Sequence, residues 1–207
     1  MKFEELLDRL QEFDLLLDAD SKLPSVTGFV AGDNVRGSWW THPQSHEMYH
    51  LACQLRAHSD VLMVKLISGK VTLVHRHLWP AVFAVATARE PWQLEELSKE
   101  AKALLKKVDK ETEVSASGDR VRDLEGRLLV YSESVHTERG FHSKQLESWK
   151  SWAQRANLGS VELSSSEAKA QLEGVVARLN KQFKAAGTLP WRRKWRRRSL
   201  VSSALLD

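Results

Sequence analysis

The clearest structural pattern in this chain of 207 residues lies in Val61-Leu62-Met63-Val64-Lys65-Leu66-Ile67-Ser68-Gly69-Lys70-Val71-Thr72-Leu73-Val74-His75. Two apolar runs rich in β-branched residues flank Ser68-Gly69, which predicts a β-hairpin with a two-residue turn. The resulting register places Lys65 opposite Thr72. One face of the hairpin is then expected in the core, and the other carries the polar side chains of Lys65, Lys70, Thr72 and Arg76.

Helical patterns surround this hairpin in the sequence. Apolar residues recur at helical spacing over residues 3–17, 48–55, 80–89, 94–108, 121–135, 146–153 and 172–183. Residues 25–40 are predicted to be a loop or a short strand, and the polar stretch 109–118 a loop, a hairpin tip or a linker. Ser164 and Glu167 form a capping-box pattern before the last helix. No internal repeat is detectable in the sequence.

These elements predict an α+β fold that is mostly helical, with winged-helix-like helices around a β-hairpin and a C-terminal helical extension. We expect four parts. They are an N-terminal amphipathic helix at 1–23, an α+β winged-helix-like core at 24–157, a C-terminal helix at 158–190 and a basic tail at 191–207. A fold class by itself does not define a function.

The composition excludes several classes of protein. With 42% hydrophobic and 28% charged residues, the chain is neither disordered nor fibrous. No apolar run is long enough to span a membrane, and the start Met1-Lys2-Phe3-Glu4-Glu5 does not resemble a secretory signal. The single cysteine, Cys53, excludes an internal disulfide framework and a zinc finger. We therefore expect a cytoplasmic protein.

The positive charge is concentrated at the C-terminal end. Residues 191–198 contain six cations and no anion, and removing them from the net charge of +4 leaves −2. Such a segment needs partners to be buried. Nucleic acid, an acidic protein partner, the acidic residues 1–23 and a membrane surface are the alternatives, and nuclear import is another if the source is a eukaryote.

Tryptophans accompany cations both near the hairpin and in the tail. Cations bind phosphates and release counterions, while aromatic rings stack on unpaired bases. We therefore predict nucleic-acid contacts, to DNA in particular, by Trp39, Trp40, Lys70, Thr72, Arg76, Trp191, Arg192, Arg193, Lys194, Trp195, Arg196, Arg197 and Arg198. The competing interpretation is that the tryptophans outside the tail lie in the core.

Lys65 is the first catalytic candidate. An amine with apolar neighbours loses its proton more readily and can then attack an aldehyde carbon, the chemistry of lyases that act on abasic sites. The alternative is a lysine that extends from a sheet edge into solvent.

His136 and Glu138 are the second catalytic candidates. A carboxylate beside an imidazole can act as an acid–base pair, and Gly140 predicts a bend that would bring both groups close to His142. The alternative is an ordinary loop between two helices.

His46-Glu47-Met48-Tyr49-His50 matches the HExxH pattern of zinc hydrolases. On a helix, His46 and His50 share one face and can bind zinc, with Glu47 as the general base. The sequence does not indicate a third ligand. We expect no cofactor in the preferred interpretation. A zinc-dependent hydrolase and a non-enzymatic interaction protein with a basic docking tail are the alternatives.

Three strings carry a resemblance to known proteins. They are Gly37-Ser38-Trp39-Trp40-Thr41-His42-Pro43, the hairpin segment 64–76, and Leu78-Trp79-Pro80. They are similar to a family of bacterial proteins that resemble winged-helix DNA repair proteins of the glycosylase type, over about residues 24–155. The resemblance implies DNA repair by a glycosylase or abasic-site lyase. It implies no catalytic residues, because the glutamine-rich motif of bacterial winged-helix crosslink glycosylases is not visible here.

Overall fold

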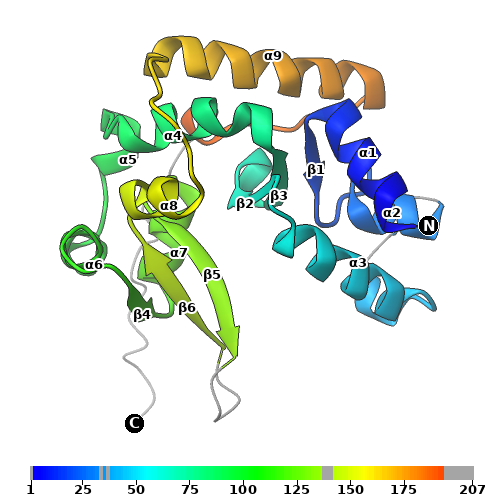
Figure 1. The fold of residues 1–207 in the computed structure, drawn as a ribbon, viewed down its shortest axis with the longest axis horizontal. Coiled ribbons are helices and arrows are strands. Elements are labelled where there is room, and N and C mark those ends of the chain that lie inside the picture. The colour runs from blue at the N-terminus through cyan, green and yellow to red at the C-terminus, as the bar shows by residue number, and fades with distance from the viewer. Residues whose placement is uncertain (1, 33–34, 36–37, 137–141, 194–207) are drawn as a thin grey trace, which may run out of the picture.

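The structure, a computed structural model, describes residues 2–32, 35, 38–136 and 142–193. Within them the chain forms two three-stranded antiparallel sheets surrounded by helices, which confirms the α+β, mostly helical class. Figure 1 shows the two sheets side by side, with α4 (Trp79–Thr87) and α9 (Ser165–Phe183) running past both. None of the described helices is long and apolar enough to cross a membrane.

The first unit comprises residues 3–75. Its elements are α1 (Phe3–Phe13), β1 (Leu15–Leu17), α2 (Val26–Ala31), α3 (Ser45–Ala57), β2 (Val61–Lys65) and β3 (Val71–His75). A short 3-10 helix, η1 (Trp39–Thr41), leads into α3. The strand order is β1-β3-β2, so β3 is the central strand, and it is covered on both faces at Leu73 and Val74.

The β2–β3 hairpin is confirmed, but its predicted turn and register are wrong. Residues 66–70 connect the strands, because Ser68-Gly69 adopts positive φ inside a 3-10 turn instead of forming a two-residue turn. Lys65 is therefore paired with Val71 and not with Thr72. A shift of one residue exchanges the two faces of a strand. Thr72 accordingly lies on the covered face and is fully buried.

Two further segments of the first unit differ from their prediction. Leu15–Leu17 form an edge strand instead of continuing the first helix, because Asp14 has a φ of 69° and ends α1. Residues 26–31 form helix α2 instead of a loop or strand. The hydroxyl of Ser25 accepts a hydrogen bond from the Gly28 N–H (3.1 Å) and caps the start of this helix.

The second unit comprises residues 91–155. Its elements are α5 (Pro91–Leu94), α6 (Lys99–Val108), β4 (Val114–Ala116), α7 (Asp119–Gly126), β5 (Tyr131–His136), β6 (His142–Glu147) and α8 (Trp149–Arg155). The helix predicted over 121–135 is correct only as far as Gly126. Residues 131–136 and 142–147 instead pair as antiparallel strands, and each satisfies the backbone hydrogen bonds of the other.

The two units share one topology. Each has a helix, a strand, a helix and a hairpin in that order, and the first unit contains one additional helix, α2. In each unit the first strand pairs with the last strand of the hairpin, giving the orders β1-β3-β2 and β4-β6-β5. The repeat is therefore one of topology, although no repeat is detectable in the sequence.

The core explains where most of the tryptophans lie. A large hydrophobic cluster joins the first unit to α4, α8 and α9, and a smaller one fills the second unit. Trp79 lies in the larger cluster and donates its Nε1–H to the carbonyl of Val74 (3.1 Å), so the core interpretation is correct for this residue. Helix α9 begins with the predicted capping box of Ser164 and Glu167.

Candidate functional site

An exposed aromatic cluster lies where η1 leads into α3. The Trp40 ring stacks on Trp39 with 3.9 Å between centroids and 23° between planes, and Tyr49 lies 5.9 Å from Trp40. Trp39 is partly buried and packs against the larger hydrophobic cluster. Trp40 is 61% exposed and Tyr49 44%, and Leu94 is the only other large hydrophobic side chain exposed among the described residues. Exposed apolar side chains gathered at one place indicate an interaction site.

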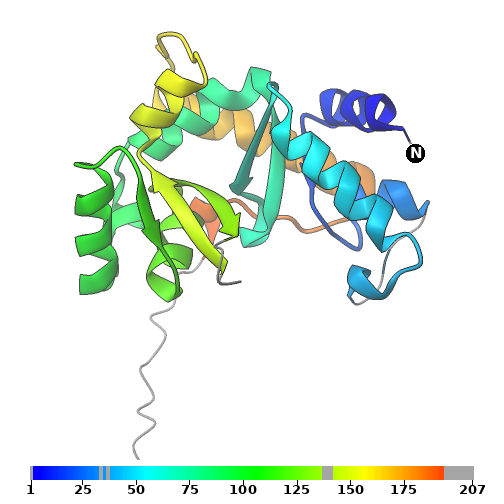
Figure 2. The same ribbon diagram turned by 60° about the horizontal axis from the view of Figure 1, so that its bottom comes forward.

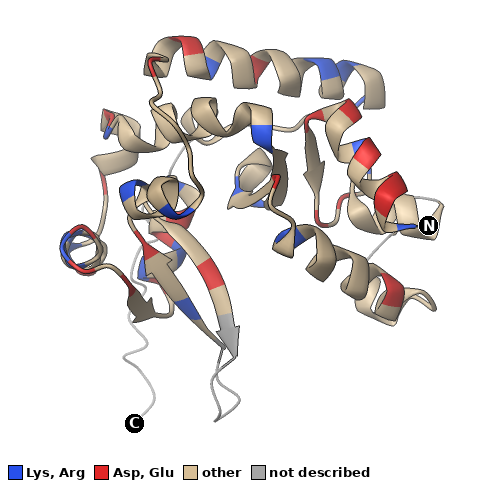
Figure 3. Ribbon diagram, viewed as in Figure 1, with Lys and Arg blue, Asp and Glu red and all other residues tan. Residues whose placement is uncertain are grey.

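The solvent face of α3 continues this surface with polar groups. His46, His50 and Gln54 are exposed along it, and their side chains can donate and accept hydrogen bonds. Helix α3 contains one cation, Arg56, which is ion-paired with Asp18 at 2.6 Å. Figure 3 shows the helix mostly free of charged residues. The face is therefore suited to stacking and hydrogen bonding more than to phosphate attraction.

The zinc alternative gains no further ligand from the structure. His46 and His50 do share the exposed face of α3, as their spacing predicts. In the described part of the chain, however, no three His, Cys, Asp or Glu residues are grouped so that they could hold a metal. His58, the nearest downstream histidine, accepts a hydrogen bond from the Asp60 N–H and lies beside the ring of Phe3.

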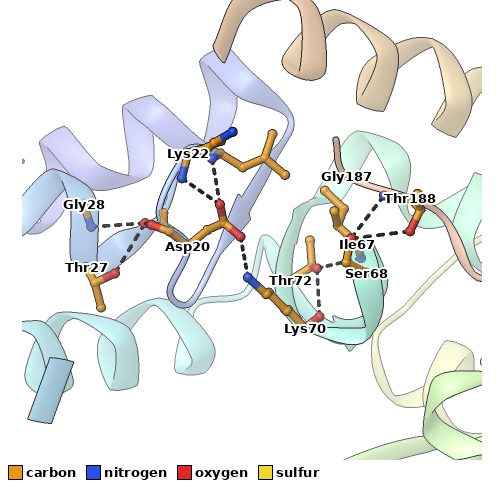
Figure 4. Close-up of polar contacts among 12 residues, drawn as sticks. Asp20, Lys22, Thr27, Gly28, Ile67, Ser68, Lys70, Thr72, Gly187 and Thr188 are labelled. Atoms are coloured by element: carbon orange, nitrogen blue, oxygen red, sulfur yellow. Dashed lines mark hydrogen bonds and ion pairs between the residues drawn. The ribbon is translucent and has the colours of Figure 1, made fainter. Parts of the chain in front are cut away.

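The turn of the β2–β3 hairpin is held from two sides, as Figure 4 shows. Lys70 Nζ lies 2.6 Å from Asp20 Oδ2, and the N–H groups of Lys22 and Leu23 donate to the other oxygen of Asp20. Partial burial raises the pKa of Asp20, but these hydrogen bonds and the charge of Lys70 bring it below its usual value. Lys70 is half exposed but has an ionic partner, and the buried Thr72 is not available to nucleic acid.

The C-terminal segment crosses this same turn. The Ser68 N–H donates to the carbonyl of Thr188 (2.7 Å), and the Thr188 N–H donates to Ser68 Oγ (3.2 Å). The guanidinium of Arg193 lies against Gly69, where an added Cβ would be 2.4 Å from Nη1. Arg193, the last described residue, therefore lies directly beside the hairpin turn.

The first residues of the predicted basic tail belong to the folded structure. Trp191, in η4 (Pro190–Arg192), donates its Nε1–H to Glu173 Oε1 (2.7 Å) and packs against the core. Arg192 binds both carboxylate oxygens of Glu173, at 2.9 and 3.0 Å. Trp191 and Arg192 thus bind α9. Lys194, Trp195, Arg196, Arg197 and Arg198 lie outside the described residues.

Lys65 belongs to an ionic cluster between the two sheets. Its Nζ lies 2.5 Å from Glu125 Oε2, Ser132 donates to Oε1 at 2.5 Å, and Lys144 Nζ lies 3.5 Å from Oε1. The cluster lines a cavity of about 30 Å³, and Glu125 is buried. Burial raises the pKa of Glu125, but the hydrogen bonds from Lys65 and Ser132 and the charge of Lys144 bring it below its usual value.

This environment differs from the apolar one expected for Lys65. In place of apolar neighbours alone, its Nζ has the carboxylate of Glu125 at 2.5 Å. Arg76, at the other end of the hairpin, also has an acidic partner within the protein. Its Nη1 lies 3.2 Å from Asp60 Oδ1, and its guanidinium lies over the ring of Trp79. Catalysis by Lys65 stays a prediction.

The second catalytic pair falls mainly outside the described part of the chain. Glu138 lies there, and of His136 the structure describes the backbone, which is paired with His142 across β5 and β6. The segments that flank Gly140, expected to be helices, are thus two paired strands, β5 and β6, and Gly140 itself lies outside the described residues. Catalysis by His136 and Glu138 stays a prediction.

Sequence reasoning missed three groups of residues. Glu125 belongs to a helix pattern and gave no signal of an ionic partner. Asp14, His75 and His77 form a hydrogen-bonded chain that only the fold assembles. The exposed lysines of α6 recur at helical spacing, and this pattern was available in the sequence.

Comparison with protein-family models, with curated proteins and with solved structures gives no match.

Proposed function

We propose that this protein binds nucleic acid, DNA in particular, and stacks an unpaired base on Trp40. The observation that carries the proposal is the exposed indole of Trp40, supported from behind by Trp39 and flanked by Tyr49. Every base has an aromatic face, so such a platform binds single-stranded or extruded bases with little sequence preference. The neighbouring imidazoles of His46 and His50 would then bind base edges or sugars.

The order of the elements supports a winged-helix-like role for the first unit. Helix, strand, two helices and a hairpin follow one another, and β1 pairs with the last strand of the hairpin. In DNA-binding proteins of the helix-turn-helix type, the helix in the position of α3 contacts the bases. Figure 2 shows the β2–β3 hairpin between α3 on one side and strands β5 and β6 on the other. We assign the base contacts to α3 and its aromatic cluster.

The test is binding of labelled DNA by fluorescence anisotropy. We expect Trp40→Ala to weaken binding of single-stranded DNA by about 5- to 150-fold, since stacking contributes about 1–3 kcal/mol per base. Trp40→Phe should keep most of the affinity, because it keeps an aromatic ring. Single-stranded, duplex and abasic DNA are compared at two salt concentrations.

Leu94→Ala is the matched control, because it removes an exposed apolar side chain from the other unit. Equal weakening by Leu94→Ala and Trp40→Ala would contradict the proposal, as would a wild-type protein that binds none of the three DNAs. With abasic DNA, borohydride is added in a parallel sample. A trapped adduct that Lys65→Met removes would add the Schiff-base chemistry predicted for Lys65.

A further inference from the structure

A stripe of lysines runs along the solvent face of α6. Lys99, Lys102, Lys106 and Lys110 follow one another at intervals of three, four and four residues, which places them on one side of a helix. All four are exposed, and Lys110 follows directly after the last turn. The opposite side of the helix is buried in the second hydrophobic cluster, through Ala101, Leu104, Leu105 and Val108.

The acids near this stripe form no ion pair with its four lysines in the described part of the chain, although Glu100 directly follows Lys99 and interacts with its charge. Asp109 is ion-paired with Arg89 at 2.7 Å, and Glu111 lies 3.7 Å from Lys107, which is on the flank of the stripe. None of the four lysines has an ion pair within the described ranges 2–32, 35, 38–136 and 142–193. The stripe is therefore a row of four positive charges that face solvent.

The fold itself does not require these charges. Helix α6 precedes β4 as α1 precedes β1, so the two helices occupy equivalent positions in the two units. Helix α1 carries four acids, Glu4, Glu5, Asp8 and Glu12, on its exposed side. Figure 3 shows acidic residues in red along α1. Equivalent helices with opposite charge indicate that the lysines of α6 serve a ligand.

We propose that the α6 stripe binds the phosphate backbone of the nucleic acid whose bases stack on Trp40. This inference rests on the proposed function and adds phosphate contacts outside the first unit. At the first unit, Lys70, Arg76 and Arg56 are paired with Asp20, Asp60 and Asp18. The lysines repeat about every 5–6 Å along the helix axis, close enough to contact neighbouring phosphates of one strand.

The two contact surfaces lie far apart. In both Figure 1 and Figure 2, α6 and α3 are at opposite ends of the molecule. A strand that contacts both must therefore run the length of the protein. Short DNA can occupy the Trp40 platform alone, whereas long DNA also reaches the lysines.

The experiment compares two double variants on DNA of two lengths. Lys102→Gln/Lys106→Gln removes two charges from the stripe, and Lys150→Gln/Lys181→Gln removes two exposed lysines from α8 and α9. Binding of single-stranded DNA of about 8 and about 40 nucleotides is measured over a series of salt concentrations. For the long DNA, the stripe variant should lower the slope of log affinity against log salt by about 1.4, at about 0.7 per phosphate contact.

The remaining outcomes separate this inference from the proposed function. Equal slopes for the two variants on long DNA overturn the stripe, even if Trp40→Ala weakens binding. A stripe effect that is as large on short DNA overturns the two-surface arrangement. Binding that depends on the lysines but not on Trp40 overturns the proposed function and keeps the stripe. Circular dichroism of both variants shows whether α6 remains folded.

Discussion

Lys65 and Glu125 form an ion pair that joins β2 of the first unit to α7 of the second. The buried carboxylate of Glu125 accepts hydrogen bonds from Lys65 and Ser132 and forms a longer ion pair with Lys144. A buried charge that loses its partner is costly, because desolvation is no longer offset. The ammonium at 2.5 Å should therefore stabilise the fold more than that of Lys144 at 3.5 Å.

We predict that Lys65→Met lowers the free energy of unfolding by about 1–3 kcal/mol, because it leaves Glu125 with weaker partners. Methionine keeps the length and apolar character of the lysine stem. Lys144→Met is the matched control and should cost less than half as much. Urea denaturation measures both variants at neutral pH. Equal costs, or no cost for Lys65→Met, would show that Glu125 does not depend on this lysine.

His75, His77 and Asp14 form a hydrogen-bonded chain at the end of β3 opposite the hairpin turn. The Nδ1 atoms of His75 and His77 are 2.7 Å apart, so one ring donates and the other accepts. His77 Nε2 lies 2.9 Å from Asp14, which also binds Arg178 of α9. Burial and the nearby His77 lower the pKa of His75 below 6.5, although Asp60 and Asp14 oppose the shift.

At the level of elements, the contacts among His75, His77 and Asp14 predict that the fold loses stability in acid. A histidine whose pKa is lowered by folding stabilises the folded state above its unfolded value of about 6.5, and this stabilisation is lost as the pH falls through the lower folded value. Protonating both rings also leaves the Nδ1–Nδ1 contact without an acceptor. We expect the free energy of unfolding to fall between about pH 7 and pH 5 more steeply in wild type than in His75→Gln. His50→Gln, at an exposed site on α3, is the control and should follow wild type. Parallel profiles for all three proteins would refute the role of His75.

The elements also show what sequence patterns can and cannot specify. The buried stripe of α3 and the capping box of α9 were predicted correctly, because a helix of several turns repeats its pattern often enough to be recognised. Leu15–Leu17 and residues 131–135 were assigned to helices and belong to strands, because short segments fit both periods and long-range pairing decides between them. The register of the β2–β3 hairpin was predicted one residue away from the observed one, and the observed register places Thr72 on the buried face.

In the candidate site, too, local sequence identified the residue types, and long-range contacts decided which side chains are exposed. Trp39 and Trp40 were identified from composition, but only the fold distinguishes the exposed Trp40 from the buried Trp79. Ion pairs such as Lys70 with Asp20 join residues 50 positions apart, so their formation could not be predicted from local spacing. Among the cations expected to bind nucleic acid, Lys70, Arg76 and Arg192 have an acidic partner within the described part of the chain.

At the scale of the whole molecule, the proposed stacking and phosphate contacts are divided among separate surfaces. The aromatic cluster belongs to the first unit and the lysine stripe to the second, and Arg193, the last described residue, lies beside the β2–β3 hairpin turn. Trp191 and Arg192 are bound to Glu173 of α9 and anchor the start of the tail. The tail cations beyond them, Lys194, Arg196, Arg197 and Arg198, can therefore be removed without removing this anchor.

We predict that a chain ending at Arg193 keeps its thermal stability but loses affinity for DNA, with the salt slope lowered by up to about 3 for single-stranded DNA. A chain ending at Arg198 is the control, because it keeps all four cations and lacks only residues 199–207. It should retain the slope of the full chain. A chain ending at Leu189 should in addition unfold at lower temperature, since it lacks the hydrogen bonds of Trp191 and Arg192 to Glu173. If the chain ending at Arg193 binds DNA with the slope of the full chain, the tail makes no phosphate contacts, and the positive end of this protein serves another anionic partner.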